Sequence, residues 1–328
     1  MEHQMSKISN IASQIKLVRE KFPDKSILEA FLILLDIKYW QKRKRMLWNE
    51  YFWYDFLQKS KKERLEYVLD YEVMNEIPAI CNNKDFVKYL NEKPLFNEKF
   101  KNYLGRDFSV FSKDGYSEFC DFLNKHKSVI VKPLNGMGGH GIEKINCDAF
   151  NIEEFNRLTK CGPFMAEEII LQHSAMSKLN PDSVNTIRIV TMRNKGNVVA
   201  PLASIRIGRL GSCVDNFCSG GMAAKINVDS GIVETAAFDR NLESFEIHPD
   251  TKIKIVGFQI PLWEKVVECV LEASELLPEC RYIGWDVAIG KDDNIYLIEG
   301  NSRPATDVFQ LPAKRGLREI YNKYLGLI

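Results

Sequence analysis

The sequence contains no apolar run that approaches the ~20 residues needed to span a bilayer. Its N-terminus also lacks a basic segment followed by an apolar core, the pattern of a secretory signal. Lysine and arginine (45) nearly balance aspartate and glutamate (44), and the net charge of +1 provides no global field that would attract nucleic acid or anionic lipid. We therefore expect a cytoplasmic protein with no transmembrane segment and no nucleic-acid partner.

The eight cysteines are scattered singly along the chain. The closest pair, Cys213 and Cys218, has no histidine cluster nearby that would complete a zinc site, so we expect mostly buried thiols. The rest of the composition is ordinary, with 328 residues of which 45% are apolar and 27% charged. Such a chain is long enough for two or three subdomains with substantial cores.

The first 80 residues are predicted to form an N-terminal helical region, because apolar residues such as Ile11, Ile15 and Val18 recur there at helix spacing. Between residues 38 and 53, lysines and arginines alternate with aromatic residues. This pattern favours a solvated basic face with an aromatic underside that packs on the main body. The alternatives are a nucleic-acid or membrane surface and a docking face for an anionic acceptor.

From about residue 83 the pattern changes to short strands alternating with short helices, which predicts an α/β-type region over residues 81–328. Strands are expected at 108–111 and 128–132, with a helix between them. Residues 184–238 are strand-rich with turn formers at 194–196 and 229–231, which predicts antiparallel pairing. An amphipathic helix is expected between Pro261 and Pro278.

A hairpin near the C-terminus is predicted to carry a metal site. Apolar runs at 282–288 and 295–299 flank a cluster of turn formers. Symmetric pairing places Asp286 opposite Glu299, with side-chain origins roughly 5 Å apart, and Asn301 continues the same face. Opposed carboxylates repel each other unless a cation lies between them, and oxygen ligands suit magnesium carrying nucleotide phosphates. The alternative is a solvated hairpin with incidental acids.

A glycine-rich segment follows Lys132, which ends a predicted strand. Four glycines in six residues would let backbone amides approach an anion closely. A dinucleotide fingerprint must open a helix, but residues 142–145 alternate like a strand, and the lysine of a P-loop is missing. We interpret the segment as a strand-to-strand loop that folds over nucleotide phosphates, with Lys132 as their cation; a purely structural hairpin is the alternative. The loop residues are Gly136, Met137, Gly138, Gly139, His140 and Gly141.

The apolar segment 165–173 contains Glu167 and Glu168 at its centre. Recognition of a purine needs a carboxylate or main-chain carbonyl that accepts from the exocyclic amine, a main-chain amide that donates to the ring, and apolar walls. Either glutamate is a candidate for this role. Alternatively, one glutamate caps an edge strand and the other is paired on the surface.

The order of these motifs resembles the ATP-grasp superfamily. Four stretches resemble its sugar-transfer-associated branch, whose members accompany polysaccharide biosynthesis genes: Asn-Thr-Ile-Arg-Ile-Val-Thr at 185–191, His-Pro-Asp-Thr at 248–251, Ile-Gly-Trp-Asp-Val-Ala at 283–288, and Ile-Glu-Gly-Asn-Ser-Arg-Pro at 298–304. The similarity extends upstream to residues 50–52 and 60–64, so most of the chain is covered.

The resemblance implies an α+β fold in which two subdomains grip ATP, here a glycine-loop subdomain at about 108–170 and a metal-site subdomain at about 171–328. It implies ATP and Mg²⁺ as cofactors, and the joining of a carboxylate to an amine through an acylphosphate. The substrates would be small molecules, either a sugar acid or an amino acid in surface polysaccharide biosynthesis. A sugar or small-molecule kinase using the same ATP site, and a non-catalytic nucleotide-binding protein of such a pathway, are the alternatives.

The resemblance also assigns roles to individual residues. Phosphates would be contacted by Lys132 and by Lys93, with Lys84 as the competitor for the second role. The adenine hinge would be formed by Glu167, Glu168, Ile169 and Ile170, and His173 takes the ribose position, where many relatives have an acid. Magnesium would be held by Asp286, Glu299 and Asn301. The γ-phosphate and the substrate carboxylate would be faced by Arg188, Arg206 and Arg303, whose alternative role is surface ion pairing.

This chain departs from the family pattern at one position beside the metal site. Several relatives carry an arginine two residues before the metal aspartate, where this chain has Gly284. The cationic role would therefore fall to Arg188 or Arg206. The sequence does not determine the oligomeric state.

Overall fold

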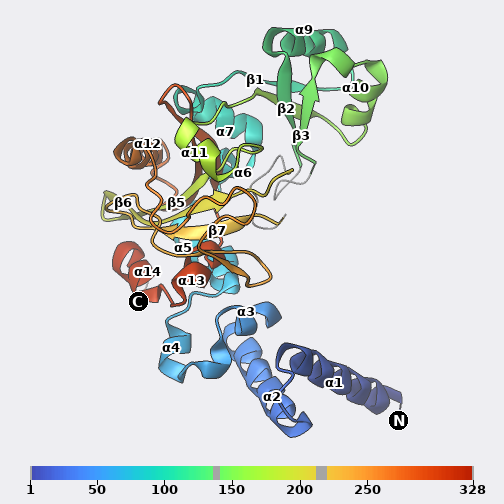
Figure 1. Ribbon diagram of the computed structural model, residues 1–328, viewed down its shortest axis with the longest axis vertical. Helices are drawn as coiled ribbons and strands as arrows, with labels where there is room; N and C mark the ends of the chain where they lie inside the picture. The colour runs from blue at the N-terminus through green and yellow to red at the C-terminus, as the bar shows by residue number, and fades with distance from the viewer. Residues whose placement is uncertain (1, 136–140, 212–219, 327–328) are drawn as a thin grey trace.

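The computed structural model describes residues 2–135, 141–211 and 220–326, with the side chains of residues 2–9 left out of the description. The molecule is elongated (Figure 1). Helices of the N-terminal region lie at one end, a seven-stranded sheet with helices on both faces lies in the middle, and a small four-stranded sheet lies at the other end. Within the described part of the chain, no helix is both long enough and apolar enough to cross a membrane.

The N-terminal region has its own hydrophobic core. Its helices are α1 (Glu2–Lys21), α2 (Ile27–Lys44), α3 (Trp48–Trp53), the 3₁₀ turn η1 (Phe56–Gln58) and α4 (Lys61–Leu65). A capping box at Ser26 and Glu29 begins α2. The predicted aromatic underside exists, but Trp40 and Tyr51 pack into this region's own core rather than on the main body. Among the described residues, Trp53 packs against both this core and the α13-side core of the seven-stranded sheet.

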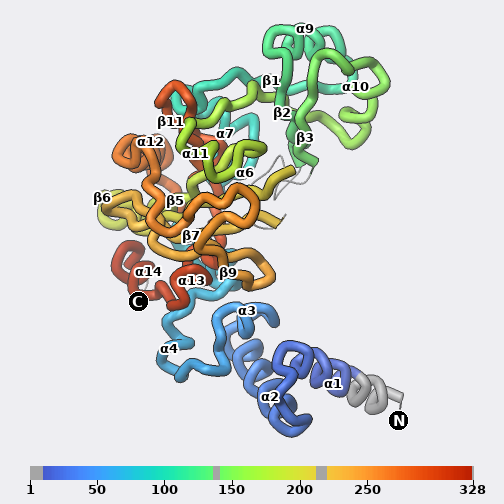
Figure 2. The backbone as a smooth tube through the Cα atoms, viewed as in Figure 1, coloured from blue at the N-terminus to red at the C-terminus, as the bar shows by residue number. Residues whose placement is uncertain are grey.

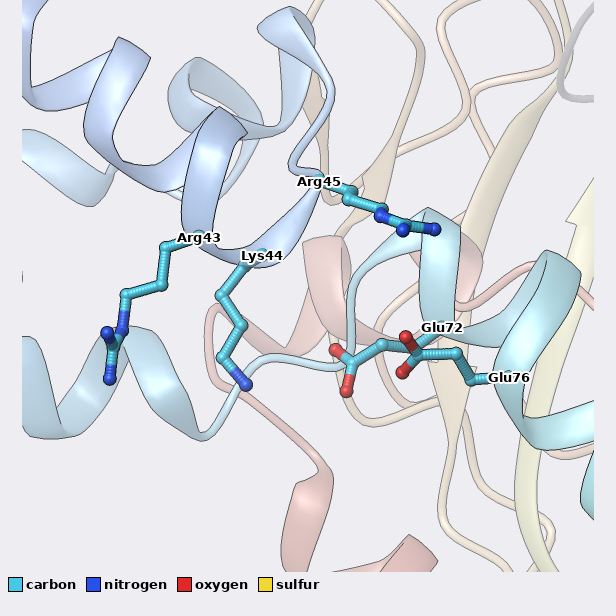
Figure 3. Close-up of a pocket in the computed structure, with 5 residues that line it drawn as sticks. All are labelled: Arg43, Lys44, Arg45, Glu72 and Glu76. Atoms are coloured by element: carbon cyan, nitrogen blue, oxygen red, sulfur yellow. The ribbon is translucent and has the colours of Figure 1, made fainter.

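The basic C-terminal end of α2 meets the π-helical turn η2 (Glu72–Glu76) at the junction with the main body. A cavity of about 180 Å³ lies there, lined by Arg43, Lys44, Arg45, Glu72 and Glu76 (Figure 3). Arg45 stacks over Tyr71 at 4.3 Å, and Glu72 is paired with Arg318. Because acids form the opposite wall, this end of α2 is part of a mixed-charge joint rather than a uniformly cationic surface.

The four-stranded sheet has the order β1-β4-β2-β3 and is antiparallel throughout. Its strands are β1 (Phe108–Phe111), β2 (Ser128–Pro133), β3 (Glu143–Asn146) and β4 (Phe164–Glu168). Helices α9 (Tyr116–His126) and α10 (Ile152–Thr159) pack on it through a phenylalanine-rich core. Residues 143–146 do form a strand, which pairs with β2, so the sequence prediction that the glycine segment joins two strands is confirmed.

The seven-stranded sheet has the order β11-β10-β5-β6-β7-β8-β9 and is also antiparallel. Its strands are β5 (Ile187–Asn194), β6 (Asn197–Ile207), β7 (Met222–Ile226), β8 (Ala237–Phe238), β9 (Ser244–Phe245), β10 (Tyr282–Ile289) and β11 (Ile295–Asn301). The predicted turn after β5 is confirmed: Lys195 and Gly196 both have positive φ, as a tight hairpin with the twist of the flanking strands requires.

Helices cover both faces of this sheet, which explains why β10 is buried along its whole length. One face packs on α6 (Lys88–Asn91), α7 (Lys93–Lys99), α8 (Lys101–Leu104), α11 (Ser174–Leu179) and α12 (Trp263–Glu275). The other packs on α5 (Ile77–Cys81), α13 (Asp307–Ala313) and α14 (Arg318–Leu325). Along β10, Trp285 and Val287 enter the first core while Tyr282 enters the second, so Asp286 points to the α13 side.

The cysteine prediction is only half correct. Six cysteines lie in the described residues and are free thiols; Cys81, Cys269 and Cys280 are buried, Cys120 and Cys147 are half-buried, and Cys161 is exposed. Cys213 and Cys218 lie outside the described residues.

Candidate active site

Three charged residues form a row across adjacent strands of the seven-stranded sheet. Asp286 on β10 lies opposite Glu299 on β11, and on its other side it lies opposite Arg188 on β5. Asn301 lies opposite Gly284, two residues along the same face. The predicted pairing of Asp286 with Glu299 is therefore confirmed, but the predicted symmetric register is not: the pairs next to the turn are shifted by one residue, and a β-bulge between Asp286 and Val287 brings Glu299 opposite Asp286.

Asp286 is buried and ion-paired with two arginines. Arg188 donates to it through Nε and through Nη2, the latter at 2.9 Å, and Arg206 on β6 donates through Nη1 at 2.7 Å. Burial disfavours the charged carboxylate, but the two guanidinium groups outweigh burial and hold the pKa of Asp286 well below its usual range. The geometry thus gives Asp286 two cationic partners beside Glu299.

Glu299 is the accessible acid of the row, with 51% of its side chain exposed. It accepts a hydrogen bond from Asn301 Nδ2 at 3.3 Å, and Arg188 Nη2 lies 4.0 Å from its Oε1. Loss of water around its carboxylate raises the pKa of Glu299, and the negative charge of Asp286 raises it further. A divalent cation between the two carboxylates would relieve that repulsion, and the donor set of two carboxylates and one amide oxygen fits a hard cation such as Mg²⁺.

The structure explains why glycine occupies position 284. A Cβ built on Gly284 would lie 2.5 Å from Cβ of Pro304 and 3.5 Å from Cδ of Arg188. A side chain at this position would collide with Pro304, and the arginine side chain beside Asp286 comes from β5 instead. Both candidates for the cationic role, Arg188 and Arg206, donate hydrogen bonds to Asp286.

A second charged group belongs to the four-stranded sheet and centres on Glu167. Only 3% of this residue is exposed, and its carboxylate accepts from Lys132 Nζ at 2.6 Å, Arg106 Nε at 3.0 Å and Asn97 Nδ2 at 3.0 Å. The nearby cations overcome the effect of burial and hold the pKa of Glu167 well below its usual range. The carboxylate of Glu167 is thus engaged in positioning Lys132.

Lys93 connects the two charged groups. It begins α7, and its Nζ lies 3.4 Å from the carbonyl oxygen of Leu134, next to the glycine segment. Burial lowers the pKa of Lys93; the charge of Glu299 opposes that shift and the charge of Lys132 adds to it. Lys84 is exposed in the turn before α6. The structure therefore places Lys93, rather than Lys84, near Lys132, the other lysine that is predicted to contact phosphates.

The predicted hinge lies where β4 ends. Strand pairing stops at Glu168, and Ile169 and Ile170 continue towards α11 outside the ladder. His173 has a structural task there: its Nδ1 accepts from the amide of Ala175 at 3.1 Å, and its Nε2 lies 3.5 Å from Asp293 in the β10–β11 turn.

Two other predicted sites are placed less completely. In the glycine loop, Gly141 has a φ of +74° and packs against Pro133, whereas Gly136, Met137, Gly138, Gly139 and His140 lie outside the described residues. Arg303 is exposed in the bend after β11, and none of the described hydrogen bonds or ion pairs joins it to Asp286.

Sequence reasoning missed Arg106, which joins the two sheets. Its guanidinium is buried, and besides bonding Glu167 it donates to the carbonyl oxygens of Leu104 at 3.1 Å and of Leu297 on β11 at 2.7 Å. The available signal was a Gly-Arg-Asp turn directly before β1. Turn residues are usually solvated, so hydropathy gave no reason to select this arginine.

A third group of acids, also missed, lies where the N-terminal region meets α13. Glu50 is 1% exposed and accepts from the amides of Leu47 and Asp70, each at 2.7 Å. Burial raises the pKa of Glu50 to about 7 and also raises the pKa values of Asp70 and Asp307. The charge of Arg240, whose guanidinium lies 5.9 Å from the Trp53 ring, favours the ionised forms of Asp70 and Asp307.

The model of the family described as sugar-transfer associated ATP-grasp matches residues 81–324. The chain belongs to the sugar-transfer associated ATP-grasp family, and the family and α+β fold predicted from the sequence are confirmed. A search of curated proteins found no match.

Solved structures with similar folds include three ATP-grasp ligases. PsnB, in complex with a variant of its minimal precursor, Mg and ADP, is 14% identical over 71% of this chain and 57% of its own, with a TM-score of 0.44. A RiPP-associated ligase of Chryseobacterium gregarium is 13% identical over 76% and 67%, with a TM-score of 0.45. The D-alanine-D-alanine ligase of Coxiella burnetii is 10% identical over 74% and 58%, with a TM-score of 0.45. This chain thus spans little more than half the length of PsnB.

Proposed function

We propose that the protein is a carboxylate-amine ligase that uses ATP and Mg²⁺ and forms an amide through an acylphosphate. The observation that carries this proposal is the row of Arg188, Asp286 and Glu299 on three adjacent strands, with Lys93 and Lys132 on the neighbouring elements. Anionic and cationic groups in this arrangement suit a metal-bound triphosphate and a substrate carboxylate.

Each group has a distinct task in the proposal. Asp286, Glu299 and Asn301 would hold Mg²⁺, which when bound neutralises charge on the phosphates. Lys93 and Lys132 would contact phosphates, with Glu167 holding Lys132 in place. Main-chain groups of residues 168–170 would contact adenine, and residues 136–141 would close over the phosphates. His173 would lie at the ribose and Arg303 would be an outer cation.

The arginines of the row would act on the substrate. A carboxylate oxygen of the substrate attacks the γ-phosphorus, the bond to the β-phosphate oxygen breaks, and ADP leaves. Arg188 and Arg206 stabilise the charge that develops, so the protein contributes positioning and preorganised electrostatics rather than a nucleophile. The amine then attacks the acylphosphate carbonyl, loses a proton, and releases inorganic phosphate. Closure of residues 136–141 would exclude water from this intermediate.

The acceptor proposed is a sugar acid or an amino acid of a surface polysaccharide pathway, in the cytoplasm where ATP is supplied. The support for a sugar-linked pathway is the description of the matching family as sugar-transfer associated. Residues 1–80 would form a separate helical region beside the ATP-grasp region of 81–328, with a division near residue 170. The separate hydrophobic cores of the N-terminal helices and the four-stranded sheet support this organisation.

A coupled ADP-release screen that pairs sugar carboxylates with amino acids tests the proposal, with mass analysis of the product. A ligase releases ADP and phosphate together and only when both substrates are present. ADP without free phosphate, and a product heavier by one phosphoryl group, would identify a kinase instead. ATP binding without turnover across the whole panel would favour a non-catalytic role.

A further inference from the structure

Helix α2 is apolar around almost its whole circumference. From residue 27 to 37 its only polar residues are Glu29 and Asp36. One face packs into the N-terminal core through Ala30, Ile33, Leu34, Ile37 and Trp40. The opposite face exposes six large apolar side chains by between 37% and 68%, namely Ile27, Leu28, Phe31, Leu32, Leu35 and Tyr39. A helix that is apolar all round is ordinarily covered on all sides.

The exposed face has the spacing of a coiled-coil seam. Leu28, Leu32, Leu35 and Tyr39 follow one another at intervals of four, three and four residues, the pattern that packs against a second helix. A two-fold axis through the midpoint of Ile33 and Leu34 exchanges Leu28 with Tyr39 and Leu32 with Leu35. The seam is therefore complementary to an antiparallel copy of itself, as an isologous dimer interface must be.

The direction of α2 favours the same antiparallel arrangement. The last turn of the helix carries Lys42, Arg43 and Lys44. The macrodipoles of the two helices would also oppose each other favourably. A parallel pair would bring the basic ends together.

The size and position of this face suit a second copy of the chain. The exposed area of these six side chains is roughly 600 Å² per copy, compared with about 800 Å² buried per partner in a typical stable interface. The α1–α2 pair lies at the end of the molecule farthest from the four-stranded sheet (Figures 1 and 2). A partner there would leave the row around Asp286 uncovered.

From these observations we propose that the protein forms a homodimer through antiparallel packing of the exposed α2 faces. In each half of the interface Leu28 packs on Tyr39 of the other copy, and Leu32 packs on its Leu35. The proposal concerns assembly alone and does not depend on the reaction that the protein catalyses.

Sedimentation velocity on the full chain tests the proposal at micromolar concentration. The wild type should sediment as a particle of about 76 kDa, twice the chain mass of 37.8 kDa. Leu32→Glu places carboxylates against an apolar residue of each partner and should weaken association by about 100-fold or more, giving monomer. Adding Leu35→Lys to that variant creates two Glu-Lys pairs across the two-fold axis and should restore the dimer at least in part.

Leu171→Glu is the matched control, because Leu171 is 56% exposed but lies in the segment after β4, and it should remain dimeric. Far-UV circular dichroism checks that each variant is folded, which is expected because Leu32 and Leu35 point away from the core. A monomeric wild type, a dimer that survives Leu32→Glu, or a double variant that stays monomeric would overturn the proposal. A wild type that is monomeric and binds phosphatidylglycerol vesicles through α2 would overturn it as well, and would make the face a lipid-binding surface.

Discussion

Arg188 and Asp286 lie directly opposite each other on β5 and β10, and the guanidinium of Arg188 donates two hydrogen bonds to the carboxylate of Asp286. The two residues are separated by almost one hundred positions in the sequence, and their contact is made by strand pairing in the centre of the sheet. Both are nearly buried, so the pair acts as one fixed electrostatic unit beside the accessible Glu299.

Replacing Arg188 with lysine should reduce turnover strongly while keeping the positive charge. Lysine cannot make the two-point contact of a guanidinium, so Asp286 would lose a donor and the substrate a fixed cation. We expect kcat/KM to fall by roughly 100-fold, the scale found when a preorganised donor is removed. Arg193→Lys is a matched control, because Arg193 lies on the same strand but pairs with Glu275, and its turnover should stay near that of the wild type. Equal losses in the two variants would contradict the special role of Arg188.

Gly284→Ala should destabilise the fold, because the new Cβ would lie 2.5 Å from Cβ of Pro304. Overpacking of this kind typically costs about 1–3 kcal/mol in the free energy of unfolding. The measurement is urea denaturation of four proteins: wild type, Gly284→Ala, Pro304→Gly and the double variant. If the two residues compete for the same space, the double variant should be more stable than the sum of the single effects predicts. If the effects of the two substitutions on the unfolding free energy simply add, Pro304 is not the residue that excludes a side chain at position 284.

Some of this arrangement could be predicted from the sequence and some could not. The hairpin follows from local information, because the turn formers at 290–294 join its two strands. The register next to the turn, with Val287 opposite Leu297, would place Asp286 opposite Ile298, and the β-bulge between Asp286 and Val287 brings Glu299 opposite Asp286 instead. The position of Arg188 and Arg206 beside Asp286 depends on which strands become neighbours in the sheet, which no local pattern encodes. Arg106 was missed for the same reason, since its partners lie on β4 and β11.

Glu167→Gln should be strongly destabilising. The substitution leaves the buried guanidinium of Arg106 and the ammonium of Lys132 without a counter-charge, and breaking a buried pair in this way costs about 3–5 kcal/mol. Denaturation with urea at pH 7 measures the loss. Glu118→Gln, on the exposed surface of α9, provides the control and should change stability by less than about 0.5 kcal/mol.

Glu167 also gives the unfolding free energy a pH dependence on the acid side. Its folded pKa lies below the usual value, so the carboxylate contributes stability above that value and the contribution is lost as pH falls through the folded pKa. We therefore expect the wild type to lose stability on acidification below about pH 4.5, the usual pKa of a glutamate. The Glu167→Gln variant should show a smaller slope there, and an unchanged slope would contradict the assignment.

Glu50 should produce the opposite pH dependence. Burial raises its folded pKa from 4.5 to about 7, so its contribution is fully present below pH 4.5 and is lost as pH rises towards 7. A shift of this size corresponds to roughly 3 kcal/mol of unfolding free energy. Glu50→Gln retains one acceptor for the amides of Leu47 and Asp70. Its unfolding free energy should be lower than that of the wild type at pH 4.5, and this difference should shrink as the pH rises towards 7. A difference between the two proteins that does not vary with pH would disprove the prediction.

The accessible acid of the row, Glu299, is proposed to hold a metal-bound nucleotide, and calorimetric titration with ATP measures that binding. We expect the wild type to bind ATP with Mg²⁺ present and at least ~10-fold more weakly after chelation, since the metal bridges carboxylates and phosphates. Glu299→Gln should lose most of the Mg²⁺-dependent affinity and all ADP release while keeping its circular dichroism spectrum, and the Glu118→Gln control should match the wild type. A Glu299→Gln protein that binds Mg²⁺-ATP and releases ADP as the wild type does would show that Glu299 does not hold the metal.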